Sequence, residues 1–561
     1  MNAIPPPASA TLTAAAVFLE TLKRLDVDYL FGNAGTDFAA VIEAYATHPY
    51  PSLLPVPITV PHENLAVAMA HGAYLATGRP QAIMVHVNVG TANAVCGLIN
   101  AAREEVPLIL CAGRNPITET GSTASRNAFI HWAQEMFDQA SMVREAVKWD
   151  YELRRGDQVE MVVERAVSIA MAHPRGPIYL TLPRETFGEP ASHSGQRIFS
   201  PVSTPAPDPQ AIAGAIDLLK GARKPLLVTG GLGREVRERE ALSALLAKHD
   251  IAVTTHRPRY MPLSLAHSNF VGFEPGPLVE EADLVIVAAC DVPWIPLHHN
   301  PSATAKIIHL GYDPNFSRYP LRGFGSDLSI AGDPAAALGA LAKIPRSDSE
   351  VTDARRIWLA SKRTAFEKSQ RRQTGQKELP TYDDVARVLA VLSRPDDRIF
   401  VETAFPTDLL NIEPGGYFGA PSSGGLGWGL GAALGMKLAA PHGRVITLVG
   451  DGAYMFGNPT PAHFVSRAND APTLTVILNN SMWAAVRRAT LAVYPDSATK
   501  SNKNAAFTYL EPSPDYEVIV AASGGYGERV DRTDQIAGAF QRAFDAVDKQ
   551  GRQAVLNINV A

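Results

Sequence analysis

The sequence predicts an α/β protein built from three doubly wound parallel-sheet domains, and two observations carry this prediction. Short, fully apolar and often β-branched runs alternate with helical patterns along all 561 residues. Strands that are apolar on both faces are typical of parallel sheets covered by helices on both sides. A chain of this length should also divide into about three domains. We expect these domains at residues 1–188, 210–345 and 375–561.

Each expected domain contributes several such strands in order. A Pro- and Ser-rich connection at 189–210 separates the first domain from the second, and a charged helical stretch at about 353–372 separates the second from the third. The clearest strands are "AIMVHV", "LILCAG" and "IYLTLP" in the first domain, "PLLVTGG", "LVIVAAC" and "KIIHLG" in the second, and "RIFVET", "VITLVG" and "TLTVILNN" in the third.

Composition narrows the class of function. The formal net charge is −5 without long like-charge runs, so nothing indicates binding to nucleic acid or to an anionic membrane. We find no basic leader before the first apolar stretch and no uninterrupted apolar window of about 18 residues, which favours a cytoplasmic protein. The three cysteines, Cys96, Cys111 and Cys290, form no CxxC motif, and we expect core thiols without disulfides.

A carboxylate follows the buried strand of "ITLVGDGAYM", at Asp451. The next strand ends in the amides Asn479 and Asn480, and Asn480 lies 29 positions after Asp451. Ligands of open parallel sheets bind at the carboxyl ends of strands. Mg²⁺ takes oxygen ligands, and phosphate groups commonly supply some of them. This pair therefore predicts a Mg²⁺-bound diphosphate.

The glycines beside Asp451 support that interpretation. Gly450 and Gly452 let backbone N–H groups approach a phosphate, and a following helix adds its positive end. The alternative is that Gly-Asp-Gly and Asn-Asn are ordinary turns, since these residue types favour turns anyway. The occurrence of both motifs at the ends of successive strands favours the metal site.

The paired pattern resembles the cofactor fingerprint of thiamine-diphosphate enzymes. The resemblance implies a pyrimidine-binding first domain, a Rossmann-like central domain and a diphosphate-binding third domain. It implies that Asp451, Asn480 and the main-chain carbonyl of Met482 hold Mg²⁺. Gly450, Gly452, Ala453 and Trp483 would complete the diphosphate-binding residues.

A second signature of the family lies in the first domain. Thiamine diphosphate reacts through a C2 carbanion, and its aminopyrimidine accepts the proton only when a carboxylic acid meets N1′. Glu63, at the start of the Ala- and Gly-rich stretch after "VPH", resembles the family's glutamate. The alternative is that Glu63 stabilises the start of a helix through a favourable interaction with the helix dipole.

Further segments extend the resemblance over nearly the whole chain. "FGNAGTDF" resembles the family's early FGxPG loop, with Ala34 in place of the usual proline. "PSSGGLGWGLGAALGMKLA" resembles the segment that bends the cofactor, with Leu426 under its rings and the carbonyl of Gly424 accepting from the 4′-amino group. Gly-Gly-Leu-Gly in the middle domain is not a full dinucleotide fingerprint, so we infer no nucleotide there. A bound FAD stays open but is not favoured.

The histidines resemble those of the benzoylformate decarboxylase branch. His86 precedes a Gly-Thr-x-Asn-Ala segment, where acetolactate synthases usually carry Gly-Pro-Gly. His267 resembles the second active-site histidine, and Thr36 a hydroxyl that binds the substrate carboxylate. For these three residues, structural roles in packing or turns stay open as alternatives.

Two departures put an aryl substrate in doubt. Ala489 stands where that branch has a bulky aromatic residue, and 487–518 resembles the mobile lid of acetolactate-synthase-like relatives. The basic residues of this segment are Arg487, Arg488, Lys500 and Lys503. They could bind an anionic substrate, but we favour the interpretation that they form a solvated charged face. We interpret His131, His298 and His299 as structural, because they have no spaced metal partners.

The resemblance implies a thiamine-diphosphate- and Mg²⁺-dependent non-oxidative decarboxylase of a 2-oxo acid, with carboligase activity. Glu63 would activate the cofactor, and His86 with His267 would move protons. The alternatives are an acetolactate-synthase-like transferase or 2-hydroxy ketone lyase, and an inactive cofactor-binding subunit. Glu63 and the diphosphate loops lie in different domains, and the resemblance implies that the first domain of one chain faces the third domain of another. It therefore implies a homodimer or homotetramer with active sites at the subunit interface.

Overall fold

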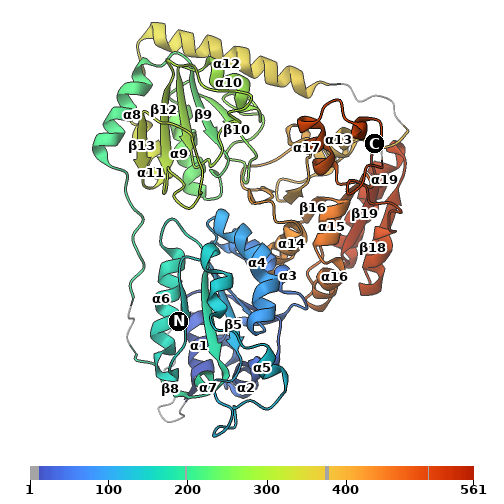
Figure 1. Ribbon diagram of the computed structural model, residues 1–561. Coiled ribbons are helices and arrows are strands. Elements are labelled where there is room, and N and C mark those ends of the chain that lie inside the picture. Colours follow the sequence, from blue (N-terminus) through green and yellow to red (C-terminus); the bar gives the residue numbers. More distant parts are fainter. Residues whose placement is uncertain (1–11, 196–198, 373–377, 503) are drawn as a thin grey trace. The chain divides into compact units, whose positions relative to one another are not determined.

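The computed structural model describes residues 12–195, 199–372, 378–502 and 504–561. The chain divides into two compact units. The first contains the described residues up to Ser203 together with Ser423–His442 and Met455–Ala471. The second contains those of Thr204–Ser422, Gly443–Tyr454 and Pro472–Ala561. Each unit is described separately below (Figure 1).

The first unit is built on a six-stranded parallel sheet of order β3-β2-β4-β5-β7-β6. Its strands are β2 (Tyr29–Gly32), β3 (Val56–Thr59), β4 (Gln81–Val85), β5 (Leu108–Arg114), β6 (Asp150–Glu152) and β7 (Ile178–Pro183), and a separate antiparallel pair joins β1 (Leu12–Thr13) to β8 (Pro190–Ala191). Its helices are α1 (Ala14–Arg24), α2 (Ala39–Thr47), α3 (Glu63–Thr77), α4 (Val87–Arg103), α5 (Ile130–Ala133), α6 (Val159–Met171), α7 (Arg184–Phe187), α14 (Trp428–Ala439) and α16 (Pro459–Ala468). Helices α1 and α6 pack together, as do α3 and α14.

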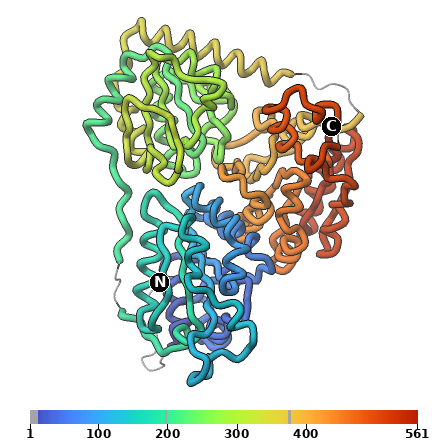
Figure 2. Tube along the Cα trace, viewed as in Figure 1, coloured from blue at the N-terminus to red at the C-terminus, as the bar shows by residue number. Residues whose placement is uncertain are grey.

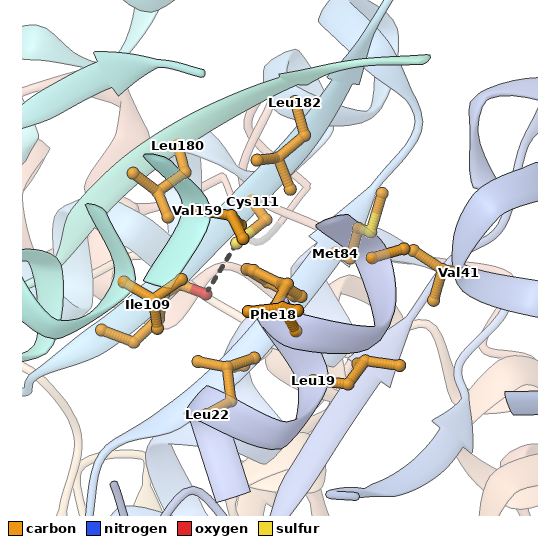
Figure 3. Close-up of a cluster of buried hydrophobic side chains, with 14 of the residues drawn as sticks. Phe18, Leu19, Leu22, Val41, Met84, Ile109, Cys111, Val159, Leu180 and Leu182 are labelled. Carbon is orange, nitrogen blue, oxygen red and sulfur yellow. Dashed lines mark hydrogen bonds between the residues drawn. The ribbon is translucent and has the colours of Figure 1, made fainter. Parts of the chain in front are cut away.

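One face of this sheet packs against α1 and α6 in a dense apolar core (Figure 3). Phe18 of α1 lies at its centre, among Met84, Ile109 and Leu180 from three neighbouring strands. Cys111 belongs to the same core, and burial raises the pKa of its thiol above the ordinary range. The strand residues that alternate with those of this core, such as Ile83 and Leu110, are also fully buried. Both faces of the strands are therefore covered, which explains why the strands are fully apolar.

The second unit contains the other two parallel sheets, which follow one another along the chain (Figure 2). The five-stranded sheet has the order β10-β9-β11-β12-β13. It consists of β9 (Pro225–Thr229), β10 (Ala252–Thr255), β11 (Leu284–Ala288), β12 (Lys306–Gly311) and β13 (Leu328–Ala331), with helices α8 (Pro209–Gly221), α9 (Val236–Leu246), α10 (Pro275–Glu281) and α11 (Pro334–Leu341). The charged stretch expected at about 353–372 forms the long helix α12 (Ser349–Gln370).

The C-terminal sheet is six-stranded, with the order β15-β14-β16-β17-β19-β18. It consists of β14 (Arg398–Glu402), β15 (Tyr417–Gly419), β16 (Val445–Gly450), β17 (Leu474–Asn479), β18 (Tyr526–Val530) and β19 (Ala554–Asn559), with helices α13 (Tyr382–Leu392), α15 (Asp451–Phe456), α17 (Ala484–Val493), α18 (Tyr516–Ile519) and α19 (Ile536–Gln550). Helix α19 packs on β17, β18 and β19.

The predicted fold class is confirmed, because three parallel sheets alternate with helices along the chain. The domain boundaries at 1–188, 210–345 and 375–561 stay predictions. One detail is wrong: Cys111 and Cys290 are buried, whereas Cys96 lies on the exposed face of α4. Within the described residues, no helix is long and apolar enough to cross a membrane.

Parallel strands end at the same edge of each sheet, and this arrangement positions the predicted residues. In the C-terminal sheet β16 and β17 are neighbours, so Asp451 and Asn480 follow adjacent strands. In the N-terminal sheet β2 and β4 are neighbours, so the loop with Thr36 and the strand end at His86 lie at one edge.

Candidate active site

The predicted residues fall into two groups, one in each unit. In the second unit, Asp451 is the first residue of α15 and is only 2% exposed. Its Oδ1 accepts a hydrogen bond from the backbone N–H of Gly452 at 3.0 Å, while Oδ2 is buried and has no hydrogen-bond partner among the described residues. Such an oxygen is costly to bury unless another group satisfies it.

Burial also governs the charge of this carboxyl group. It raises the pKa of Asp451 to about 6, because the anion is removed from water. The backbone N–H groups of Gly452, Ser481 and Met482 oppose this shift, because they favour the charged form. A bound cation would satisfy Oδ2 and offset the cost of the buried charge, so Asp451 fits the role of a metal ligand.

The two asparagines at the end of β17 have different surroundings. Asn479 is buried, and its Nδ2 donates to Ser513 Oγ at 2.9 Å and to Asn557 Oδ1 at 3.1 Å. Asn480 is partly exposed, donates to Tyr382 Oη at 3.1 Å, and accepts from the backbone N–H of Met482. Asn479 therefore supports the sheet, while Asn480 contacts Tyr382, which interacts with the charge of Asp451.

Tyr382 lies close to the predicted metal ligands. Burial is the main cause that raises the pKa of Tyr382, and the negative charge of Asp451 is the next. The tyrosine is the first residue of α13, whose N-cap is Thr381. Its chain position, 98 residues before Asn480, explains why the motifs did not reveal it.

The glycines around Asp451 serve different purposes. A Cβ at Gly452 would lie 2.2 Å from the ring of Trp483, so the absence of a side chain allows that ring to cross the loop. A Cβ at Gly450 would meet only Thr403 Oγ1, at 3.7 Å, and its predicted approach to a phosphate stays a prediction. Ala453 is buried within α15, and Met482 pairs with Tyr509 in an antiparallel bridge.

This donor set suits a hard cation that brings other ligands with it. Among the described residues, no group of three His, Cys, Asp or Glu side chains could form a metal centre. A metal at Asp451 would therefore depend on one carboxylate, the Asn480 amide and main-chain oxygens, with a phosphate or waters for the rest. Mg²⁺ commonly binds in this way, and the residues fit a Mg²⁺-diphosphate group.

In the first unit, Glu63 is the first residue of α3 and is 8% exposed. Asn93 of α4 donates to its Oε2 at 3.2 Å. A Cβ at Gly90 would lie 3.2 Å from Glu63 Oε1 and 3.0 Å from Val85, so the glycine leaves room for the carboxyl group. A buried carboxyl group at a helix start agrees with either interpretation of Glu63, and its catalytic role stays a prediction.

His86 lies directly after β4 and has an acidic partner. Its Nδ1 is 2.6 Å from Oδ1 of the buried Asp37. The hydrogen bond with Asp37 is the largest cause that raises the pKa of His86, followed by an opposing effect of burial and by the charges of Asp37 and Glu63. The structure thus places Glu63 close enough to His86 for its charge to raise the pKa of the histidine. Thr36, the predicted substrate-binding residue, is exposed beside Asp37.

The segment predicted to bend the cofactor is held by α4. Asn100 donates to the carbonyl of Gly425 at 2.8 Å, and its Oδ1 accepts from Gly425 N and Ser423 Oγ. Gly424 adopts φ +69°, which favours glycine, and Leu426 is partly buried. Asn100 was not predicted, because it lies 325 residues before Gly425, to which it is hydrogen-bonded.

His267 lies on the loop after β10 in the second unit. Its Nδ1 accepts from the backbone N–H of Asn269 at 3.2 Å, and its carbonyl accepts from Arg363. Burial lowers the pKa of His267, and the charge of Arg363 adds to this effect. These contacts agree with the structural alternative, while the catalytic role stays a prediction.

The remaining predicted residues lie at or near the surface. Ala489, Arg488 and Lys500 are exposed, and Arg487 holds the carbonyls of Lys500 and Asn502. Lys503 lies outside the described residues.

The three histidines interpreted as structural have local contacts or exposed positions. His131 is buried and its Nδ1 accepts from Asn127, His299 pairs with Glu280, and His298 is exposed.

Three models of thiamine pyrophosphate enzymes match the chain in order. The N-terminal TPP binding domain matches residues 12–142, the central domain 212–341 and the C-terminal TPP binding domain 407–558. Together these matches cover most of the chain, including Glu63, His86, His267 and Asp451.

Individual relatives match over most of their length. The chain is 28% identical to benzoylformate decarboxylase of Pseudomonas aeruginosa over 505 residues, which are 85% of this chain and 87% of that protein. It is 23% identical to the acetolactate synthase large subunit of Haemophilus influenzae, over 96% of this chain and 93% of that protein. A solved structure of thiamine diphosphate-dependent 4-hydroxybenzoylformate decarboxylase from Rhodococcus jostii superimposes with a TM-score of 0.79, at 21% identity over 98% of this chain and 99% of that one.

Proposed function

Because the chain belongs to the thiamine pyrophosphate enzyme family, we propose that it is a Mg²⁺-dependent, non-oxidative decarboxylase of a 2-oxo acid with carboligase activity. The observation that carries this proposal is His86, which is paired with Asp37 and lies in the electrostatic field of Glu63. A histidine at this place supplies the proton transfers that a non-oxidative decarboxylase needs. The 28% identity to a benzoylformate decarboxylase supports the same branch.

Residues of the second unit would hold the metal and the diphosphate of the cofactor. Asp451, Asn480 and the main-chain carbonyl of Met482 would bind Mg²⁺, and the backbone at Gly450 and Gly452 would face the diphosphate. When bound, thiamine diphosphate supplies the carbon nucleophile for the ketone of a 2-oxo acid and takes up the electron pair released with CO₂.

Residues of the first unit would bind the rings of the cofactor and the carboxylate of the substrate. Glu63 would exchange a proton with N1′ of the aminopyrimidine, while the carbonyl of Gly424 would accept from its 4′-amino group. Leu426 would support the rings. The hydroxyl group of Thr36 would donate a hydrogen bond to the substrate carboxylate.

Proton transfer to the substrate would belong to His86 at Nε2, because Asp37 holds Nδ1. His267 would act as a second proton carrier through Nε2, since its Nδ1 accepts from Asn269. Protonation of the product carbon releases an aldehyde. Transfer to a second carbonyl compound instead gives a 2-hydroxy ketone.

A panel of 2-oxo acids tests this function directly. With Mg²⁺ and thiamine diphosphate present, we expect CO₂ release from at least one of benzoylformate, its ring-substituted analogues, branched 2-oxo acids and pyruvate. The aldehyde should form in equal amount unless an acceptor aldehyde is added. Failure of every acid, with cofactor binding established by calorimetry, would contradict the proposal.

An acetolactate-synthase-like transferase is the second candidate. The match to the Haemophilus influenzae large subunit extends over 96% of this chain, and this coverage favours the candidate. Pyruvate alone distinguishes the two functions, because a synthase would convert two pyruvate molecules to acetolactate and one CO₂. A decarboxylase would give acetaldehyde and CO₂ in equal amounts.

His86→Ala should lower kcat for decarboxylation by about 10²- to 10⁴-fold, because it removes the proton donor at the substrate. The affinity for thiamine diphosphate and the melting temperature should change little. Carboligation of an added aldehyde should fall less, since that reaction does not need the final protonation. The matched control is His299→Ala, which replaces a partly exposed histidine paired with Glu280 and should leave kcat unchanged. A destabilised but fully active His86→Ala would support the structural alternative.

We also propose a homodimer or homotetramer whose active sites combine Glu63 of one subunit with Asp451 of another. Helix α4 supports a protein interface next to Glu63. It contains no charged residue before Arg103, and its exposed positions include Val89, at 47%, and Ile99, at 40%. Apolar exposure on one helix face is typical of a surface that another protein covers.

A further inference from the structure

Asp37 directs both of its carboxylate oxygens at the segment that carries His86. Oδ1 is 2.6 Å from His86 Nδ1, and Oδ2 accepts the backbone N–H of Val87 at 3.2 Å. The carboxylate is 5% exposed and lies in the short 3₁₀ turn after β2. Two hydrogen bonds to consecutive residues fix the carboxylate relative to both the ring and the start of α4.

Two glycines leave the space in which this pair lies. A Cβ at Gly35 would be 2.1 Å from His86 Nδ1, and a Cβ at Gly113 would be 1.9 Å from Asp37 Oδ2. Real Cβ atoms do not approach other atoms so closely, so a side chain at either position would displace the carboxylate or the ring. The loop after β2 and the last residues of strand β5 therefore both leave room for the Asp37–His86 contact, at Gly35 and Gly113 respectively.

The other ring nitrogen of His86 also has a neighbour. Gln134 Nε2 lies 3.4 Å from His86 Nε2, while Gln134 Oε1 is buried without a hydrogen-bond partner among the described residues. The oxygen and nitrogen of an amide are assigned from their surroundings. If the Gln134 amide is turned over, its oxygen faces Nε2 and accepts a hydrogen bond from a protonated ring.

We propose that Asp37 is a positioning residue that holds Nδ1–H of His86 and presents the ring to the substrate as an imidazolium, with Nε2–H as the only proton that it donates. This inference rests on the proposed function, in which His86 moves protons. In the donation step the Nε2–H bond breaks, its electron pair stays on nitrogen, and the proton passes to a substrate atom. The neutral ring that remains keeps its Nδ1 proton on the hydrogen bond to Asp37.

The charges around the ring agree with this assignment. Asp37 on the loop after β2 and Glu63 on α3 both raise the pKa of His86, the first chiefly through its hydrogen bond, while burial opposes them. His131 of α5 also interacts electrostatically with the ring, and burial lowers the pKa of His131. His131 therefore favours its neutral form and competes little with a positive His86. A positive ring also attracts the carboxylate of a 2-oxo acid.

The test measures the protonation of His86 without relying on activity. Nitrogen-15 chemical shifts of histidine-labelled full-length protein, loaded with Mg²⁺ and thiamine diphosphate, report the protonation of each ring nitrogen as a function of pH. The signal of His86 is assigned by its loss in His86→Gln. In the wild type we expect both nitrogens to be protonated at pH values where an unperturbed histidine, with a pKa of about 6.5, is neutral.

Asp37→Asn keeps the shape of the side chain and removes its charge. We expect the pKa of His86 to fall, kcat at neutral pH to fall by about 10- to 100-fold, and the activity optimum to move to lower pH. The direction follows because the variant ring is protonated only at lower pH. The KM for cofactor and the melting temperature should change little.

Glu20→Gln is the matched control, because it removes a carboxylate that lies 2.6 Å from two other histidines, His48 and His193. It should shift their signals and leave that of His86 unchanged. An unchanged His86 titration in Asp37→Asn would overturn the proposal. Should that variant not fold, a wild-type His86 that is neutral at pH 7, or unprotonated at Nδ1, overturns it as well. Failure of the proposed function would instead appear as absent CO₂ release with the imidazolium intact.

Discussion

Asp451→Ala is expected to weaken binding of Mg²⁺ and thiamine diphosphate strongly while leaving the melting temperature of the cofactor-free protein unchanged or higher. The two effects have one cause. The buried carboxylate has an unpaired Oδ2 and a pKa raised to about 6, so without a cation its charge opposes folding. With a cation the same charge is a ligand, and truncating one partner of a buried charge pair costs about 2–5 kcal/mol.

Calorimetry of cofactor binding and thermal unfolding of the cofactor-free protein measure the two effects separately. The adjacent asparagines offer a matched comparison. Asn480→Ala should lower cofactor affinity, because its amide contacts Tyr382, which interacts with the charge of Asp451. Asn479→Ala should mainly lower the melting temperature, because its hydrogen bonds join β17 to Ser513 and Asn557. Unchanged cofactor binding in Asp451→Ala would show that the metal assignment is wrong.

Glu63→Gln should lower kcat by about 10²- to 10⁴-fold with cofactor affinity nearly preserved, because glutamine keeps the shape of the side chain but cannot exchange the proton. Asn93→Ala is the companion variant. It removes the hydrogen bond to Glu63 Oε2 and should have a smaller effect, since the carboxyl group itself remains. A Glu63→Gln enzyme with normal kcat would leave Glu63 with only its role at the start of α3.

Mixing the two inactive variants tests whether active sites are shared. A dimer that combines one Glu63→Gln chain with one Asp451→Ala chain has one intact site, if each site takes Glu63 from one subunit and Asp451 from the other. Equal mixing under subunit exchange should then restore roughly a quarter of wild-type activity. The absence of recovery, with exchange verified by mass-tagged chains, would contradict a shared site.

The sequence by itself determined the fold class and predicted the main residues of the candidate site. Buried parallel strands must be apolar on both faces, so runs such as 445–450 and 474–478 are recognisable without their neighbours. Polar residues directly after such strands must lie at one sheet edge, which is why Asp451 and Asn480 were predicted together. Glu63 and His86 were predicted through the family resemblance, and Glu63 also through its place at the start of a helix.

Only the tertiary structure revealed the partners that tune these residues. Asp37 lies 49 positions before His86, Tyr382 98 before Asn480, and Asn100 325 before Gly425. An Asp in a turn or an Asn in a helix is common, and nothing in the local pattern says which distant residue it will face. That choice depends on which strands become neighbours and on the clearance left by residues such as Gly35 and Gly113. The spacing along a chain identifies the end of a strand, whereas the contact across a sheet edge depends on how the strands are ordered in the folded protein.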